Sequence, residues 1–156
     1  MEKKILLKAI EHNWGRMGPG DWNTVTWLIY HDGSFDIISA FNPSIKDPEA
    51  IAEAYERNEY PKLNEKKASG VMEQDAFSKL CDAIKCEPWR DPTLDVHACD
   101  GVAWELEAYS KDGTVEKTSG KLGYIYGHRV LETIVSLLPK DGNLYSSAAY
   151  VSVKKH

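Results

Sequence analysis

Two Asp-Gly dipeptides, each lying between two β-rich runs, constrain the fold of this chain most strongly. The runs are "TWLIYHDGSFDII" (26 to 38) and "AWELEAYSKDGTVEK" (103 to 117), and both place a tryptophan early in the first strand. Tight hairpin turns need a positive φ angle, which glycine adopts readily, so Asp-Gly in this setting predicts a β-hairpin. In the second run, alternation predicts one apolar face and one polar face. The apolar face consists of Val102, Trp104, Leu106 and Ala108, and the other face consists of Glu105, Glu107 and Tyr109.

A second shared pattern follows each hairpin. "KASGVMEQDAFSKLCDAI" (67 to 84) and "KTSGKLGYIYGHRVLETI" (117 to 134) both contain Ser-Gly and end in isoleucine, at a constant offset of 50 residues. Each stretch carries apolar residues at the spacing of one helix face, which predicts an amphipathic helix. These residues are Phe77, Leu80, Cys81 and Ile84 in the first, and Val130, Leu131, Ile134, Leu137 and Leu138 in the second. Each helix should end at, or a few residues before, a proline: Pro88 and Pro139.

These patterns predict a single α+β domain over residues 1–156, built from two diverged βββα halves, about 1–86 and 87–156. The halves should form an antiparallel sheet with the helices packed on one face. A chain of 156 residues is long enough to bury its own core in one domain. In this alignment strand 5–12 corresponds to strand 93–99.

The first half differs from the second by two added segments. The first strand of the second half is followed by Asp100-Gly101, whereas "NWGRMGPGDWN" follows the first strand of the first half. We therefore interpret residues 13–22 as an enlarged hairpin loop. The other added segment is an insertion at 43–66, where Asp47 as N-cap and Pro48 at the first helical position predict a surface helix.

The 13–22 loop is the first candidate binding site, through Trp14, Arg16 and Trp22. Hairpin loops of this length often carry function, and tryptophan and arginine are enriched at interface hot spots. The alternative, in which the tryptophans fold back as a lid on the core, remains equally open. The glycines match neither the Walker loop nor the dinucleotide loop, and a strand rather than a helix follows them.

"WGRMGPG" (14 to 20) resembles the signature of the WGR domain, a small β-rich module of nucleic-acid-binding proteins such as poly(ADP-ribose) polymerases. The resemblance implies that Trp14 stacks on a nucleic-acid end and that Arg16 contacts phosphate. It covers seven of the 156 residues, and Gly20 comes one position earlier than in that signature. Nucleic-acid binding is therefore kept as an alternative function.

A second candidate binding patch is "GYIYGHR" (123 to 129), which enters the last expected helix. It brings together Tyr124, Tyr126 and Arg129. The alternative is that this segment is a strand end packed on the helix.

Metal binding and catalysis have weaker support from the sequence. Cys81, Cys86, His97 and Cys99 lack the paired spacing of structural zinc sites, and Cys81 lies on the apolar stripe of a helix. His97 and Cys99 share a strand face, but catalytic pairs normally converge from different elements. We expect no metal and no cofactor, and a small enzyme with an unrecognised site remains a further alternative.

Charge and composition set the expected class. The formal net charge of −5 gives no general attraction to nucleic acid or to anionic lipid. No apolar run reaches the length of a membrane span, and three cysteines without a disulfide spacing suit a reducing compartment. We expect a cytoplasmic, bacterial protein-interaction or inhibitor-type module that contacts a protein partner through the 13–22 loop.

Overall fold

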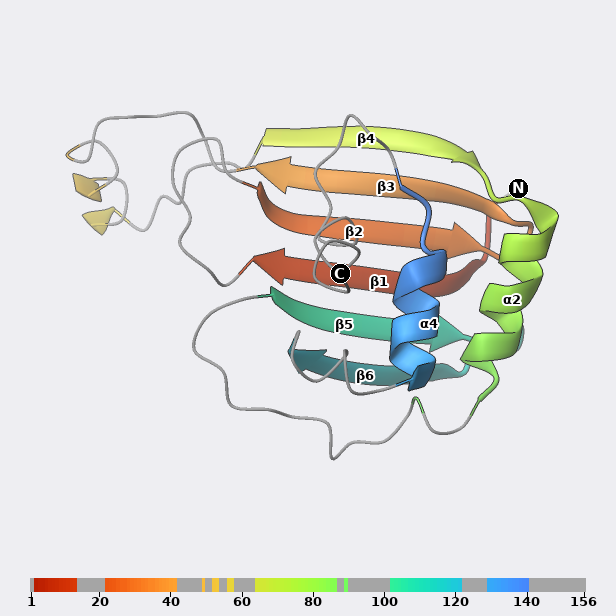
Figure 1. Cartoon of the computed structure of the whole chain (residues 1–156). Coiled ribbons are helices and arrows are strands. Elements are labelled where there is room, and N and C mark those ends of the chain that lie inside the picture. The colour runs from red at the N-terminus through yellow and green to blue at the C-terminus, as the bar shows by residue number, and fades with distance from the viewer. Residues whose placement is uncertain are drawn as a thin grey trace, which may run out of the picture.

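The computed structural model describes residues 2–13, 22–41, 49, 52–53, 56–57, 64–86, 89, 102–121 and 129–140. Within these residues the chain forms one six-stranded antiparallel sheet and two helices, in the strand order β4-β3-β2-β1-β5-β6 (Figure 1). The elements are β1 (Ile5–Asn13), β2 (Trp22–Tyr30), β3 (Ser34–Phe41), β4 (Asn64–Val71), α2 (Gln74–Ile84), β5 (Val102–Tyr109), β6 (Val115–Lys121) and α4 (Arg129–Leu137). The α+β class and the antiparallel sheet are confirmed.

Both Asp-Gly sequences form hairpin turns, joining β2 to β3 and β5 to β6. In the first turn Gly33 has a φ of 87° and its N–H donates to the carbonyl of Tyr30 at 3.0 Å. The carboxylate of Asp32 accepts the backbone N–H of Ser34 at 2.8 Å, which holds the chain as it enters β3. The second turn repeats these contacts with Ser110, Asp112, Gly113 and Thr114.

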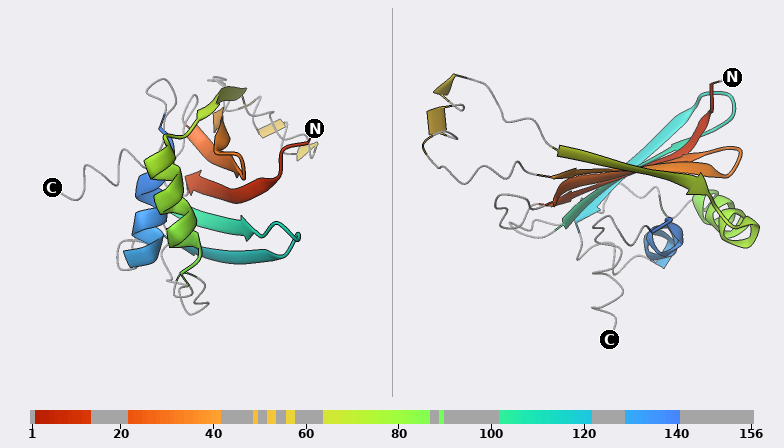
Figure 2. Two further views of the ribbon diagram at one scale, coloured as in Figure 1. Left: turned by 90° about the vertical axis from the view of Figure 1, so that its right-hand side faces the viewer. Right: turned by 90° about the horizontal axis from the view of Figure 1, so that it is seen from above.

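The core lies between the sheet and the two helices, which pack on the same face of the sheet (Figure 2). Alternate residues of the central strands are buried against α2 and α4, as the predicted period of two requires. Trp27 of β2 and Trp104 of β5 stack at the centre, with ring centroids 5.6 Å apart. The other fully buried members include Leu7, Ile29, Leu80, Leu106, Leu131 and Ile134.

Two tryptophan side chains hold the ends of the helices. The indole N–H of Trp27 donates to the carbonyl of Pro139 at 2.8 Å, just beyond the end of α4. The indole N–H of Trp89 donates to the carbonyl of Ile84, the last residue of α2. Both helices thus end a few residues before a proline, as predicted. None of the helices within the described residues is both long and apolar enough to cross a membrane.

Strand β4 was not predicted, and it begins inside the expected 43–66 insertion. Its sequence, "NEKKASGV", is polar, and its two half-buried residues, Ala68 and Gly70, are too small to give an apolar signal. Continuous antiparallel pairing with β3 defines the strand, from Ser34 opposite Val71 to Phe41 opposite Asn64. Four strands therefore precede α2, whereas the sequence predicted three.

Other parts of the predicted organisation lie partly outside the described residues. The predicted strand 93–99 lies wholly outside them. Both sides of β5 are taken by β1 and β6, so β5 has no free side for the hairpin partner that we predicted across Asp100-Gly101. Within the expected surface helix, residues 49, 52, 53 and 56 are helical and exposed, and Arg57 forms an ion pair of 3.6 Å with Glu53.

Candidate functional site

The predicted binding segments leave the sheet at one of its ends. In the register of the central strands His12 lies opposite Thr24 on one side and opposite Ala103 on the other. Ala103 in turn lies opposite Lys121, the last residue of β6. The 13–22 loop and the segment that follows β6 therefore continue from the same end of the sheet, which we call the His12 end. The opposite end of the sheet carries both Asp-Gly turns and lies beside α2, and we call it the Gly33 end (Figure 1).

Most of the predicted site residues lie outside the described residues, namely Trp14, Arg16, Tyr124 and Tyr126. Trp22 is the first residue of β2 and pairs with Phe41 of β3 at the His12 end. Arg129 is the first residue of α4 and is exposed.

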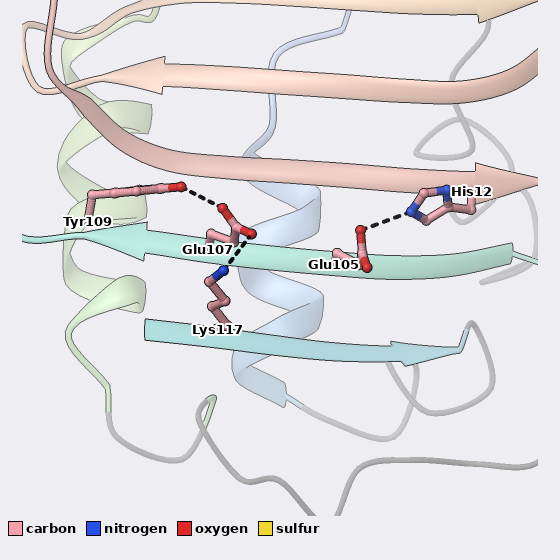
Figure 3. A network of polar contacts seen from close by, with 5 residues as sticks. All are labelled: His12, Glu105, Glu107, Tyr109 and Lys117. Carbon is pink, nitrogen blue, oxygen red and sulfur yellow. Dashed lines mark hydrogen bonds and ion pairs between the residues drawn. The ribbon is translucent and has the colours of Figure 1, made fainter. Parts of the chain in front are cut away.

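One polar contact on the sheet lies at the end of β1 from which the 13–22 loop continues. His12 Nε2 and Glu105 Oε2 are 3.0 Å apart, on the sheet face turned away from α2 and α4, which we call the outer face (Figure 3). The side chains are 30% and 51% exposed, so both can reach a partner that contacts this end. The sequence assigned Glu105 to a polar strand face but did not identify His12, because the pairing of β1 with β5 joins residues 93 positions apart.

A polar cluster occupies the outer face of β2, β3 and β4, centred on Asp36. Its carboxylate accepts hydrogen bonds from Ser69 Oγ at 2.5 Å and from the Tyr30 hydroxyl at 2.7 Å, and Lys67 Nζ lies 3.9 Å away. The bonds from Ser69 and then Tyr30 hold the pKa of Asp36 below its usual value. The Tyr30 hydroxyl donates this hydrogen bond to the ionised Asp36, and the bond is the chief cause that raises the pKa of Tyr30 to about 12.

A matching cluster occupies the outer face of β5 and β6, centred on Glu107 (Figure 3). The Tyr109 hydroxyl donates to Glu107 Oε2 at 2.5 Å, and Lys117 Nζ lies 3.5 Å from Oε1. The bond from Tyr109 lowers the pKa of Glu107, and the same bond raises the pKa of Tyr109. In both clusters the pKa of the carboxyl group is lowered and the pKa of the phenol is raised. Both shifts lead away from pH 7, where a general acid or base works best. Their chemistry suits holding the sheet surface in one arrangement.

The cysteines and histidines considered for metal or catalysis do not converge within the described residues. Burial raises the pKa of the half-buried Cys81 thiol, which disfavours the reactive thiolate. Cys86 is exposed, and His97 and Cys99 lie outside the described residues. In the part of the chain that the structure describes, no three histidine, cysteine or acidic side chains are grouped to hold a metal ion.

Comparison of the chain with protein-family models, with curated proteins and with solved structures finds no match. A functional proposal therefore depends on the site alone.

Proposed function

We propose that this protein is a non-catalytic protein-interaction or inhibitor-type module that contacts its partner with the His12 end of the sheet. The observation that carries the proposal is the strand register. Pairing through His12, Ala103 and Lys121 puts the ends of β1 and β6, from which the two predicted aromatic-basic segments continue, at the same end of the sheet. A partner that contacts the His12 end would meet both segments at once.

The scaffold beneath the 13–22 loop supports this role. β1 and β2 are the two central strands, each with a hydrogen-bonded neighbour on both sides, and they carry the loop on their adjoining ends. A loop held on such rigid strands loses less conformational freedom on binding than one on an edge strand would. Trp14 and Arg16 would supply the anchoring contacts, with His12 and Glu105 at the margin.

The charge of the whole chain favours a basic partner. A net charge of −5 attracts a positively charged protein surface, and this attraction weakens as salt screens it. Capture of the partner should therefore decline between low and physiological ionic strength.

An affinity capture from host lysate, run with and without nuclease treatment, tests the proposal. The native chain is compared with a Trp14→Ala/Arg16→Ala variant and with a Lys111→Ala/Val115→Ala control, which changes exposed residues at the Gly33 end. All three chains are first shown to have the same thermal unfolding midpoint. We expect one protein to be captured by the native and control chains and lost with the loop variant.

Two other results would contradict the proposal. Equal capture by the native chain and the loop variant would assign the loop a structural role as a lid. Capture that depends on nucleic acid, and disappears with nuclease, would favour the WGR-like alternative.

We also propose that the chain is built from two corresponding halves. Ser69-Gly70 and Ser119-Gly120 both lie on edge strands, β4 and β6, and each edge strand precedes a helix. In both pairs the glycine lies opposite an aromatic residue, Phe35 for Gly70 and Trp104 for Gly120. If the halves correspond, residues 93–99 should form a strand that pairs with a segment other than β5, which already pairs with β1 and β6, and alternate amides of 93–99 should be protected from hydrogen exchange. Fast exchange throughout that segment would contradict the proposal.

A further inference from the structure

A pocket of about 450 Å³ lies at the Gly33 end, between α2 and the ends of β1, β5 and β6. This volume falls in the range of about 300–1,000 Å³ that is typical of small-molecule sites. Its wall is largely apolar, because α2 contributes Phe77 and Ile84 while the strands contribute Leu6 and Ala108. Such a wall favours a ligand with an apolar body.

The polar groups of the pocket give it an excess of positive charge. Lys85, just beyond the end of α2, and Lys111, in the β5–β6 turn, both line it and are exposed. Glu116 of β6 is the acidic residue in the lining, so two ammonium groups stand against one carboxylate. His31, in the β2–β3 turn, also lines the pocket, and its Nε2 lies 3.1 Å from the carbonyl oxygen of Tyr109.

The His31 contact also ties the two hairpins together at the pocket. His31 belongs to the turn between β2 and β3, and Tyr109 is the last residue of β5. Gly33, two residues further on, lies under the ring of Phe77, whose carbon atoms would be 3.8–4.0 Å from an added Cβ. The pocket is therefore bounded by packed segments from both hairpins and from α2, and its shape does not depend on one free loop.

We propose that this α2 pocket binds a small molecule with an apolar body and one anionic group. The apolar body would lie against Phe77, Ile84 and Leu6, and the anionic group would lie at the rim between Lys85 and Lys111. An ammonium group is a suitable partner for a carboxylate, and removal of the body from water would supply most of the affinity. This inference is independent of the proposed interaction at the His12 end, because the two sites lie at opposite ends of the strands.

Two cysteines near the pocket provide a built-in measurement. Cys81 lines the pocket and is half-buried, whereas Cys86 is exposed and is not among its lining residues. Trypsin cuts after Lys79 and Lys85, so the two thiols fall on separate peptides, 80–85 and 86–90. Alkylation with iodoacetamide followed by mass spectrometry therefore measures each thiol within one sample.

The experiment uses 4-phenylbutyrate as the probe and 4-phenylbutanol as its neutral control, because the two share one apolar body. Binding to the full chain is measured by ligand-observed NMR and by the rate of alkylation at both cysteines. We expect 4-phenylbutyrate to slow alkylation of Cys81 severalfold while leaving Cys86 unchanged. A Lys85→Gln/Lys111→Gln variant is followed by NMR, because Lys85→Gln removes the trypsin site between the two cysteines. It should bind the acid roughly threefold to tenfold more weakly, the range for losing two solvent-exposed ion pairs. The same variant should bind the alcohol as the native chain does.

Three outcomes would overturn the proposal. Equal affinity of the native chain for the acid and the alcohol would remove the anionic requirement. Unchanged alkylation of Cys81 at a probe concentration that saturates binding would place the probe elsewhere. Absence of binding by a natively folded chain would show that the pocket does not take this class of ligand.

Discussion

Phe35 and Gly70 face each other across β3 and β4, and their packing depends on the absence of a Cβ at Gly70. A Cβ added at Gly70 would lie 2.7 Å from Cζ of Phe35, which is closer than two carbon atoms that are not bonded to each other can approach. The ring therefore covers the glycine of the edge strand, an arrangement known to stabilise glycine in sheets. At this position the small residue is a packing requirement.

Gly70→Ala should lower the free energy of unfolding by roughly 1–2 kcal/mol, because the ring of Phe35 must move. The loss is partly offset by the smaller entropy of the unfolded chain when alanine replaces glycine. Urea denaturation measures the change. In a Phe35→Leu background the effect of Gly70→Ala should shrink, since the clash is absent; an equal effect in both backgrounds would contradict this packing.

Ser69→Ala tests the cluster around Asp36. The bond from Ser69 is the largest cause of the lowered pKa of Asp36, so the variant should raise that pKa toward the ordinary value. A carboxyl whose pKa is lowered on folding contributes stability above its unfolded pKa and loses it as pH falls through the folded pKa. Ser69→Ala should therefore destabilise by about 0.5–1 kcal/mol at pH 7, with the difference disappearing in acid.

Carboxyl-detected NMR titration and urea denaturation at several pH values measure both effects of Ser69→Ala. Ser119→Ala is the matched control, since Ser119 has the corresponding place on β6, opposite Glu105. A destabilisation by Ser69→Ala that persisted below the folded pKa of Asp36 would show that the bond to this carboxylate is not its cause.

The hairpin turns are the elements that the sequence predicted best. Asp-Gly carries its own physical reason, a positive φ at glycine, and both turns adopt it with the same hydrogen bonds. The alternation of β5 and the apolar stripes of α2 and α4 were equally readable, because those faces pack against the core.

Gly113→Ala should destabilise the chain by about 1–2 kcal/mol, because alanine is strained at a φ of 94°. A Cβ at this position would meet no atom within 4 Å, so the loss would reflect backbone conformation alone. Lys111→Ala, in the same turn, is the control and should change the unfolding midpoint little. A Gly113→Ala chain as stable as the native one would show that the turn relaxes to another conformation.

Strand β4 shows where prediction of elements from the sequence stops. It is an edge strand whose inward residues are small and whose outward residues are polar, so its hydropathy resembles that of a loop. Its position is fixed by hydrogen bonds to β3, which depend on tertiary pairing and leave no local pattern.

At the scale of the whole molecule, the sequence identified segments but not their arrangement. The strand order β4-β3-β2-β1-β5-β6 brings β1 beside β5, although 88 residues separate Asn13 from Val102. The contact of His12 with Glu105 depends on that adjacency, and the α2 pocket depends also on the docking of α2 against the strand ends. Neither could be predicted from spacing along the chain, whereas the 13–22 loop could, because its glycines and tryptophans are local features.

The proposed function requires the His12 end to contact a protein partner. Site-specific photo-crosslinking tests it most directly, with a photoreactive phenylalanine analogue placed at position 17 in the loop or at position 111 at the Gly33 end. We expect one protein to be crosslinked from position 17 in nuclease-treated host lysate, and we expect that protein to be absent when position 111 carries the probe. Crosslinking of the same protein from position 111 alone, or of none from position 17, would contradict it.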